Sequence, residues 1–210
     1  MLLLKFAPET VFDEHTEPDR FIHRYKGKII DCDNDEERKA GKFSARVIDV
    51  RGAMFDGCDI FDVFDSEGGA MSCYENLYES DTEDFNEKTR DVAFGGDYPW
   101  NPNILILDYL LVRPEFRGKG LGLHAIRALI QRLRQGGGLV ALKPFPLQFE
   151  VKASESPGYR KKGLHLVSLE EEKAREKLVD YYARLGFREV PDTGYMVLNP
   201  ESKLPSVEEL

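Results

Sequence analysis

The chain has 210 residues, of which 41% are hydrophobic and 32% are charged; this is enough apolar side chain for a packed core and argues against global disorder. Its formal net charge of −9 disfavours nucleic-acid binding, and no apolar run approaches the ~20 residues that a membrane span needs. The three cysteines, Cys32, Cys58 and Cys73, show no close pairing, which argues against a disulfide framework and favours a reducing, cytoplasmic location.

Charge is distributed unevenly along the chain. Residues 1–100 hold 24 acidic and 12 basic side chains, whereas residues 101–210 hold 14 acidic and 17 basic ones. The acidic half could attract a cationic substrate and the basic half an anionic cofactor; the alternative is that the acidic loops only maintain solubility. The acidic run 31–35 lacks the glycine and the final glutamate of a calcium loop, and no histidine or cysteine pair has zinc-ligand spacing. We therefore expect no metal site.

The first half is predicted to be mainly strands with polar connections. An acidic loop over residues 31–41 would join the second and third strands as a hairpin. Apolar residues from Ile60 to Tyr78 recur at helical spacing and are interrupted by Gly68-Gly69, which predicts one broken helix or two short ones. The polar segment Asp81–Arg90 is expected to be a loop. Three strands are expected in this half. The first begins with Met1–Leu4, the second spans Phe21–Asp31, and the third spans Lys42–Arg51.

The second half has clearer patterns. Ile104–Val112 is a nearly continuous apolar run of strand length, which predicts a central strand buried on both faces and ended by Pro114. An amphipathic helix follows over Leu123–Leu133. Leu139–Phe149 is another candidate strand, and its two prolines confine it to an edge or a splayed position.

A last long helix is predicted from its end signals. Ser168 fits an N-cap with a capping box, and Gly186 fits the left-handed residue that ends a helix. The residues beyond Pro200 are expected to be loose. Two short strands would close the domain, at Phe187–Val190 and Tyr195–Leu198.

The strongest functional signal is the glycine-rich sequence Val112–Gly122, which lies between the buried strand and a helix. Glycines let backbone N–H groups converge on an anion, and the helix adds its positive N-terminal end. These features predict a phosphate or pyrophosphate site. A P-loop would need Ser or Thr after Lys119, where Gly120 stands, and a dinucleotide fingerprint from Gly118 would need Gly or Ala in place of Leu123.

The pattern Arg-x-x-Gly-x-Gly from Arg117 to Gly122 resembles the acetyl-CoA pyrophosphate loop of the GNAT acetyltransferase superfamily. A second element, Tyr182 to Phe187, resembles the family's tyrosine, three residues, Gly-Phe sequence at the end of its last long helix. The resemblance covers roughly residues 100–200 and implies one α+β domain of GNAT-like α/β/α fold over residues 1–200. Its mixed central sheet would splay open between the strand ending at Val112 and the next one.

Within that domain, residues 1–100 would form a divergent, acidic, acceptor-side half, residues 101–200 the acetyl-CoA-binding half, and residues 201–210 a tail. The resemblance implies acetyl-CoA as cosubstrate and no metal. The pantetheine arm would pair with the backbone of Leu110, Leu111 and Val112 as an added strand does, with an oxyanion donor near Leu111–Val112. The pyrophosphate would lie on the amides of Arg117, Gly118, Lys119, Gly120, Leu121 and Gly122.

Two residues are candidates for catalysis. Tyr182 matches the family's general acid, which protonates the departing thiolate; the alternative is a core aromatic. Asp108, the one carboxylate in the buried strand, would act as the base or bind the amine, and the alternative is a structural salt bridge. Glu150 is a weaker rival. An asparagine that the family often has in the last helix is replaced here near Arg175.

The sequence therefore predicts a cytoplasmic N-acetyltransferase that moves an acetyl group from acetyl-CoA to a primary amine by direct attack in a ternary complex. The acceptor would be an unidentified cationic small molecule or peptide, and a homodimer is possible. Two alternatives stay open: a non-catalytic acyl-CoA-binding sensor, and a protein N-acetyltransferase that uses the acidic half as a docking surface.

Overall fold

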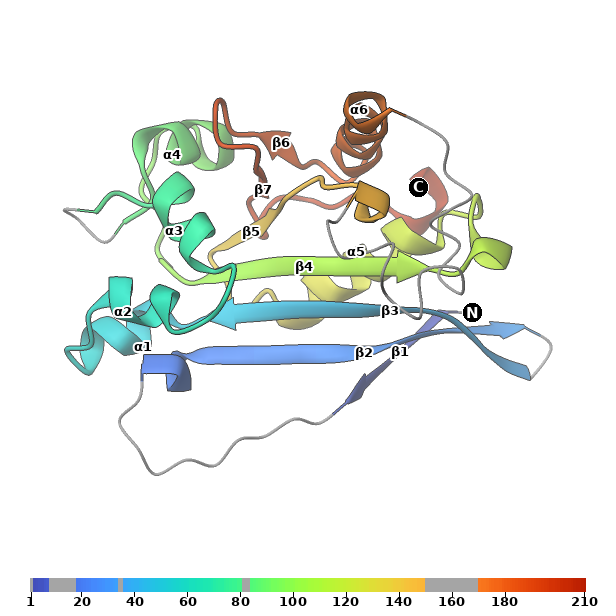
Figure 1. The fold of residues 1–210 in the computed structure, drawn as a ribbon, viewed down its shortest axis with the longest axis horizontal. Coiled ribbons are helices and arrows are strands. Elements are labelled where there is room, and N and C mark those ends of the chain that lie inside the picture. Colours follow the sequence, from blue (N-terminus) through green and yellow to red (C-terminus); the bar gives the residue numbers. More distant parts are fainter. Residues whose placement is uncertain (1, 8–17, 34–35, 81–83, 150–169) are drawn as a thin grey trace.

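The computed structural model describes residues 2–7, 18–33, 36–80, 84–149 and 170–210. A seven-stranded sheet in the order β1-β2-β3-β4-β5-β7-β6 runs through the molecule (Figure 1). Neighbouring strands are antiparallel except β4 and β5, which are parallel. The strands are β1 (Leu2–Ala7), β2 (Ile22–Asp33), β3 (Glu36–Ile48), β4 (Ile104–Val112), β5 (Leu139–Leu142), β6 (Arg188–Glu189) and β7 (Met196–Leu198).

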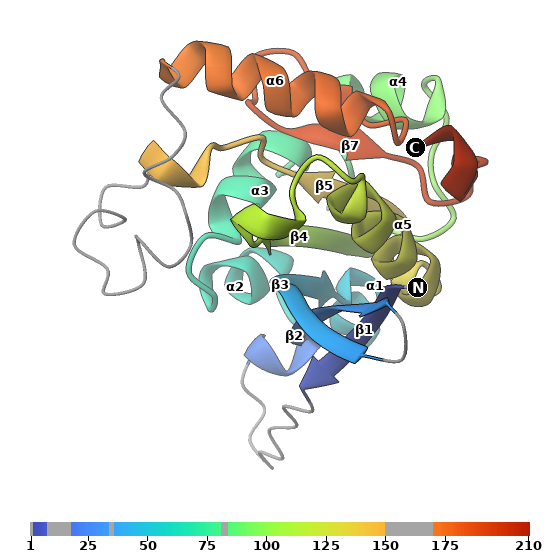
Figure 2. The same ribbon diagram turned by 90° about the vertical axis from the view of Figure 1, so that its right-hand side faces the viewer.

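Helices pack on both faces of this sheet (Figure 2). The buried side chains form two separate hydrophobic cores. The first core lies under α1 (Val50–Phe55), α2 (Ile60–Asp65), α3 (Met71–Leu77) and α4 (Glu87–Phe94). The second core lies under α5 (Leu121–Leu133) and α6 (Glu171–Ala183). Short 3-10 helices span Pro18–Phe21, Pro114–Phe116, Leu147–Phe149 and Val207–Glu209.

Strand β4 has the bounds that its apolar run predicts. Ile104 and Ile106 face the first core and Leu105 faces the second, so the first part of the strand is buried on both sides as predicted. The prediction fails for the second part, because most residues from Leu107 onward are only partly buried or exposed. The mixed sheet with helices on both faces confirms the predicted α+β class.

The hairpin of β2 and β3 is longer than its sequence suggests. Pairing continues through most of the predicted acidic loop, as far as Asp33 opposite Glu36. Opposite charges support this extension, because Arg38 lies 3.6 Å from Asp31 across the ladder. At its other end the third strand stops early: Asp49 accepts a hydrogen bond from the Gly52 N–H at 3.1 Å and so starts α1.

The helical segments of the first half were predicted in part. The break at Gly68-Gly69 separates two short helices, α2 and α3, as expected. The prediction of a loop over Asp81–Arg90 was wrong for its last four residues, because α4 begins at Glu87. Asn86 caps this helix by accepting the Thr89 N–H at 3.0 Å, and Phe85 anchors its start in the core.

At the C-terminal end, the predicted Ser168 cap lies outside the described residues, and α6 begins at Glu171. The tail beyond Pro200 is anchored rather than loose. Arg127 Nε donates to the Pro205 carbonyl at 2.7 Å, and Leu204 and Leu210 pack against the second core. Among the described residues, no helix is both long enough and apolar enough to span a membrane.

The predicted splay lies between β4 and β5. Their ladder runs from Ile104 opposite Leu139 to Leu107 opposite Leu142 and then stops, while β4 continues beside β3 to Val112. The predicted strand Leu139–Phe149 was too long: β5 ends at Leu142, before Pro144, and Leu147–Phe149 form a 3-10 helix. The edge of β4 that faces β5 is therefore unpaired from Asp108 onward within the described ladder.

Candidate active site

A bulge in β4 marks the point where the sheet opens. Ser44 lies opposite Tyr109 and Ala45 opposite Leu107, so Asp108 is the extra residue on β4. This position comes directly after the last pair between β4 and β5. Asp108 is thus placed at the mouth of the splay by backbone geometry alone.

The Asp108 carboxylate is held by two residues of β3. Its Oδ1 accepts a hydrogen bond from Arg46 Nε at 2.7 Å, with Arg46 Nη2 at 2.5 Å, and its Oδ2 accepts from Ser44 Oγ at 3.0 Å. The side chains of Arg46 and Asp108 are only 11% and 18% exposed, so the ion pair is shielded from water. The structural salt bridge that the sequence left open is therefore present.

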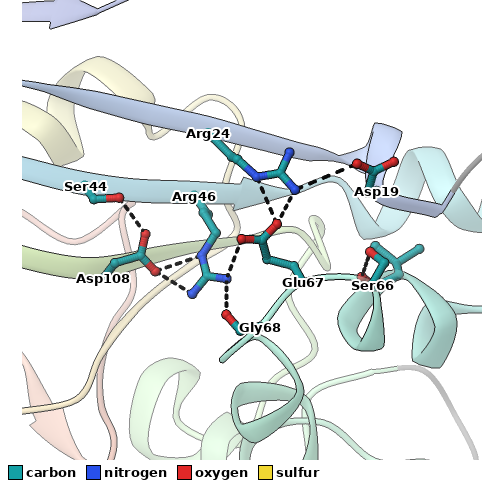
Figure 3. A network of polar contacts seen from close by, with 9 residues as sticks. Asp19, Arg24, Ser44, Arg46, Ser66, Glu67, Gly68 and Asp108 are labelled. Carbon is teal, nitrogen blue, oxygen red and sulfur yellow. Dashed lines mark hydrogen bonds and ion pairs between the residues drawn. The ribbon is translucent and has the colours of Figure 1, made fainter. Parts of the chain in front are cut away.

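Arg46 also belongs to a larger polar network (Figure 3). It donates to the Gly68 carbonyl at 3.2 Å and lies 3.7 Å from Glu67, which in turn accepts from Arg24 Nε at 2.9 Å. Arg24 lies 3.9 Å from Asp19. The alternating charges connect β2, β3, the β4 bulge and the turn between α2 and α3. The sequence analysis missed this network, although a charged Arg46 within an otherwise apolar stretch of β3 was a usable signal.

One pocket of about 120 Å³ opens at the splay. Its wall includes Asp108 and Leu110 of β4, Lys143 just after β5, and Tyr182 of α6. The structure therefore brings together the two predicted catalytic residues and one predicted cofactor residue. Lys143 was not predicted from the sequence.

Tyr182 reaches the pocket from the second core. Its ring packs edge-on against Tyr181, with centroids 5.6 Å apart, and against Phe187 at 6.3 Å. Burial raises the pKa of Tyr182 to about 12, and Tyr181 adds to this shift. The phenol thus keeps its proton at neutral pH and can serve as a donor, which is the role that the family resemblance implies.

Tyr181 holds α6 against the start of α5. Its phenolic oxygen accepts a hydrogen bond from the backbone N–H of Leu123, one of the first-turn groups that lack a partner within a helix. Burial raises the pKa of Tyr181, and this hydrogen bond partly opposes the shift. A Cβ on Gly122 would overlap the Tyr181 hydroxyl, so the close approach requires glycine.

The predicted pyrophosphate loop has the backbone of an anion site. Gly118 and Gly120 have φ values of +75° and +71°, which favour glycine, and the second of them precedes the first turn of α5. Arg117 Nε donates to the Val112 carbonyl at 3.0 Å, and burial lowers the pKa of Arg117. Lys119 is exposed. Two left-handed glycines before a helix N-terminus are typical of a phosphate-binding loop. The chain end also lies here, because a Cβ on Gly120 would be 3.7 Å from the Leu210 carbonyl oxygen.

The remaining predicted residues contribute less. Leu111 is buried beside Lys42 of β3, and Val112 packs against the second core. Glu150, the rival base, lies outside the described residues. Arg175 forms an ion pair with Glu189 of β6. Within the described part of the chain, no three potential ligands gather into a metal site.

Comparison with known proteins agrees with this geometry. Residues 73–146 match the model of the Acetyltransferase (GNAT) family. The match runs from α3 to just beyond β5 and so includes the bulge and the glycine loop, and it begins inside the half where no motif had been found. No curated protein and no solved structure shows significant similarity to the chain. Together with the mixed, splayed sheet, this match over about a third of the chain supports a GNAT superfamily acetyltransferase.

Proposed function

We propose that the protein transfers an acetyl group from acetyl-CoA to a primary amine by direct attack in a ternary complex. The observation that carries this proposal is the pocket at the splay, which is lined by both Asp108 and Tyr182. The glycine loop supports it, because its left-handed residues and the α5 N-terminus suit the pyrophosphate. The pantetheine arm would then lie along the unpaired edge of β4, at Leu110–Val112.

Acetyl transfer forms a C–N bond to the amine and breaks the C–S bond of the thioester. Tyr182 would donate a hydrogen bond to the sulfur as negative charge builds on it. A thiol ordinarily titrates near ~8.5, so a phenol with a pKa of about 12 stabilises the thiolate mainly as a donor. Backbone N–H groups near Leu111–Val112 would stabilise the oxyanion, and the pocket would supply proximity.

Asp108 is proposed as the base or the amine-binding carboxylate. Its Oδ2 accepts one hydrogen bond, from Ser44, and a carboxylate oxygen can accept a second. Arg46 and Ser44 fix the carboxylate, so an incoming amine would meet it in one orientation.

A non-catalytic acyl-CoA-binding module is the second candidate. The pairing of Asp108 with both Arg46 and Ser44 favours it, because a carboxylate engaged in this way has a structural role that needs no chemistry. The two functions differ in turnover and not in cofactor binding.

The test is a thiol-release assay with acetyl-CoA and a broad panel of primary amines, run beside calorimetry of acetyl-CoA binding. Binding with amine-dependent thiol release supports the enzyme, whereas binding without turnover supports the sensor. A protein that binds no CoA ester would contradict both. A cytoplasmic location, a peptide acceptor and a homodimer stay as predictions from the sequence.

A further inference from the structure

The pocket at the splay carries charges of both signs on one face of the sheet. Asp108 lies on the same face of β4 as Ile104 and Ile106, which pack in the first core. Lys143 follows Leu139 and Ala141 of β5, which face the same core, so strand alternation places it on that side too. Both residues line the pocket. They lie on the face opposite α5 and α6, the helices next to the cofactor loop.

Lys143 has no carboxylate partner among the residues that the structure describes. Its Nζ lies 5.1 Å from the centroid of the Tyr195 ring, and its Cε passes close to Gly194. The tyrosine face thus stabilises the ammonium without neutralising it. Arg46 differs, because Asp108 and Glu67 both lie within ion-pair distance of it.

Other acids of the first half are occupied away from the pocket. Asp49 and Asp59 cap α1 and α2, and Asp56 forms an ion pair with Arg20. Among the described residues that line the pocket, the one acid is Asp108, so the acidic excess that predicted a cationic acceptor is not concentrated there. A second ammonium on the acceptor would meet Lys143, which has no carboxylate partner in the described part of the chain.

We infer that the acceptor carries a carboxylate close to its amine, as a free amino acid does. Asp108 Oδ2 would receive the ammonium, and Lys143 would bind the carboxylate. This inference rests on the proposed acetyl transfer and adds the substrate class. The groups are complementary in sign, and both face the same opening.

The experiment compares, in the thiol-release assay, each common amino acid with its amide and its decarboxylated amine. These sets keep the side chain and the amine and differ in the carboxylate. We expect kcat/KM for the best amino acid to exceed that for its amide by about tenfold to a hundredfold, the range of a hydrogen bond to a charged group. Lys143→Met should abolish this preference and leave the Kd for acetyl-CoA unchanged.

Lys42→Met is the matched control. Lys42 lies over another tyrosine ring, that of Tyr109, at 5.0 Å, but does not line the pocket. Lys42→Met should change the ratio of kcat/KM between amino acid and amide by no more than about twofold. Amides or decarboxylated amines that react as well as amino acids would overturn the inference and leave acetyl transfer standing. An equal loss in both lysine variants would also overturn it. Absence of turnover with every amine would instead contradict the proposed function.

Discussion

The two sides of the splayed sheet are specified in different ways. The side proposed to bind the cofactor consists of consecutive residues: strand β4, a loop with two left-handed glycines, and the first turn of α5. The side proposed to bind the acceptor depends on contacts between distant parts of the chain, since Arg46 and Asp108 are 62 positions apart and Arg24 and Glu67 are 43. A site built from backbone conformation leaves a local motif, whereas one built from side-chain pairs does not.

The largest expected effect on kcat comes from a change at Tyr182, which lines the pocket between the two sides. Tyr182→Phe should lower kcat by about 10²–10³, within the range for loss of a general acid, because the thiolate would leave without a donor. The Kd for acetyl-CoA should stay the same, as measured by calorimetry. Tyr98→Phe, which alters an exposed tyrosine, is the control. Unchanged kcat in Tyr182→Phe would make Tyr182 a packing residue only.

A second test breaks the acceptor side alone. Arg46→Met should lower the free energy of unfolding by about 3 kcal/mol, because it leaves Asp108 as a shielded carboxylate without its cation. Chemical denaturation measures this. Arg20→Met removes an exposed ion pair with Asp56 and should cost less than about 1 kcal/mol.

The same pair offers a rescue. Combining Arg46→Met with Asp108→Asn removes the uncompensated charge, so the double variant should be more stable than Arg46→Met alone. Additive losses would show that the ion pair does not organise this side of the sheet.

The contact between α5 and α6 gives a smaller effect on the cofactor side. Gly122→Ala should destabilise the fold by about 1–3 kcal/mol, because the new methyl group overlaps the Tyr181 hydroxyl. Tyr181→Phe removes that hydroxyl and should recover part of the loss in the double variant. Thermal unfolding of the four proteins measures the coupling, and independent effects would contradict the contact.

Alkaline pH should weaken the fold without affecting it near neutrality. Well below pH 10, Tyr182 is protonated in both the folded and the unfolded state, so its full contribution to the free energy of unfolding is present. As the pH rises above 10, the unfolded-state phenol ionises while the folded one stays protonated up to about 12, and the free energy of unfolding falls. The slope from one such group is at most about 1.4 kcal/mol per pH unit. Tyr182→Phe should flatten the fall in urea denaturation between pH 9 and 11; an unchanged slope would contradict the assigned shift.

Features that depend on consecutive residues were predicted from the sequence, whereas those that depend on distant contacts were not. The apolar run predicted strand β4. The glycine loop and the Tyr-x-x-x-Gly-Phe element carried the family resemblance, and that resemblance implied the splay and placed Tyr182 at the site. The start of α4 escaped notice, since its N-cap Asn86 and anchor Phe85 lie in a polar segment. The pairing of β2 with β3 continues through an acidic stretch, where Arg38 lies close to Asp31. The partner of Asp108 and the position of Lys143 at the pocket depend on strand pairing, which the local sequence does not show.

The most direct test of acetyl transfer at the splay is calorimetry of acetyl-CoA binding to the wild type and to Lys119→Glu. Lys119 is the better target because glutamate at Gly120 would be strained at φ +71°. The exposed carboxylate at position 119 should weaken binding about tenfold through repulsion of the phosphates, and Lys177→Glu on α6 should not. Binding by the wild type that Lys119→Glu weakens selectively would support the loop as the cofactor site. Equal affinities in all three proteins, or no binding at all, would contradict it.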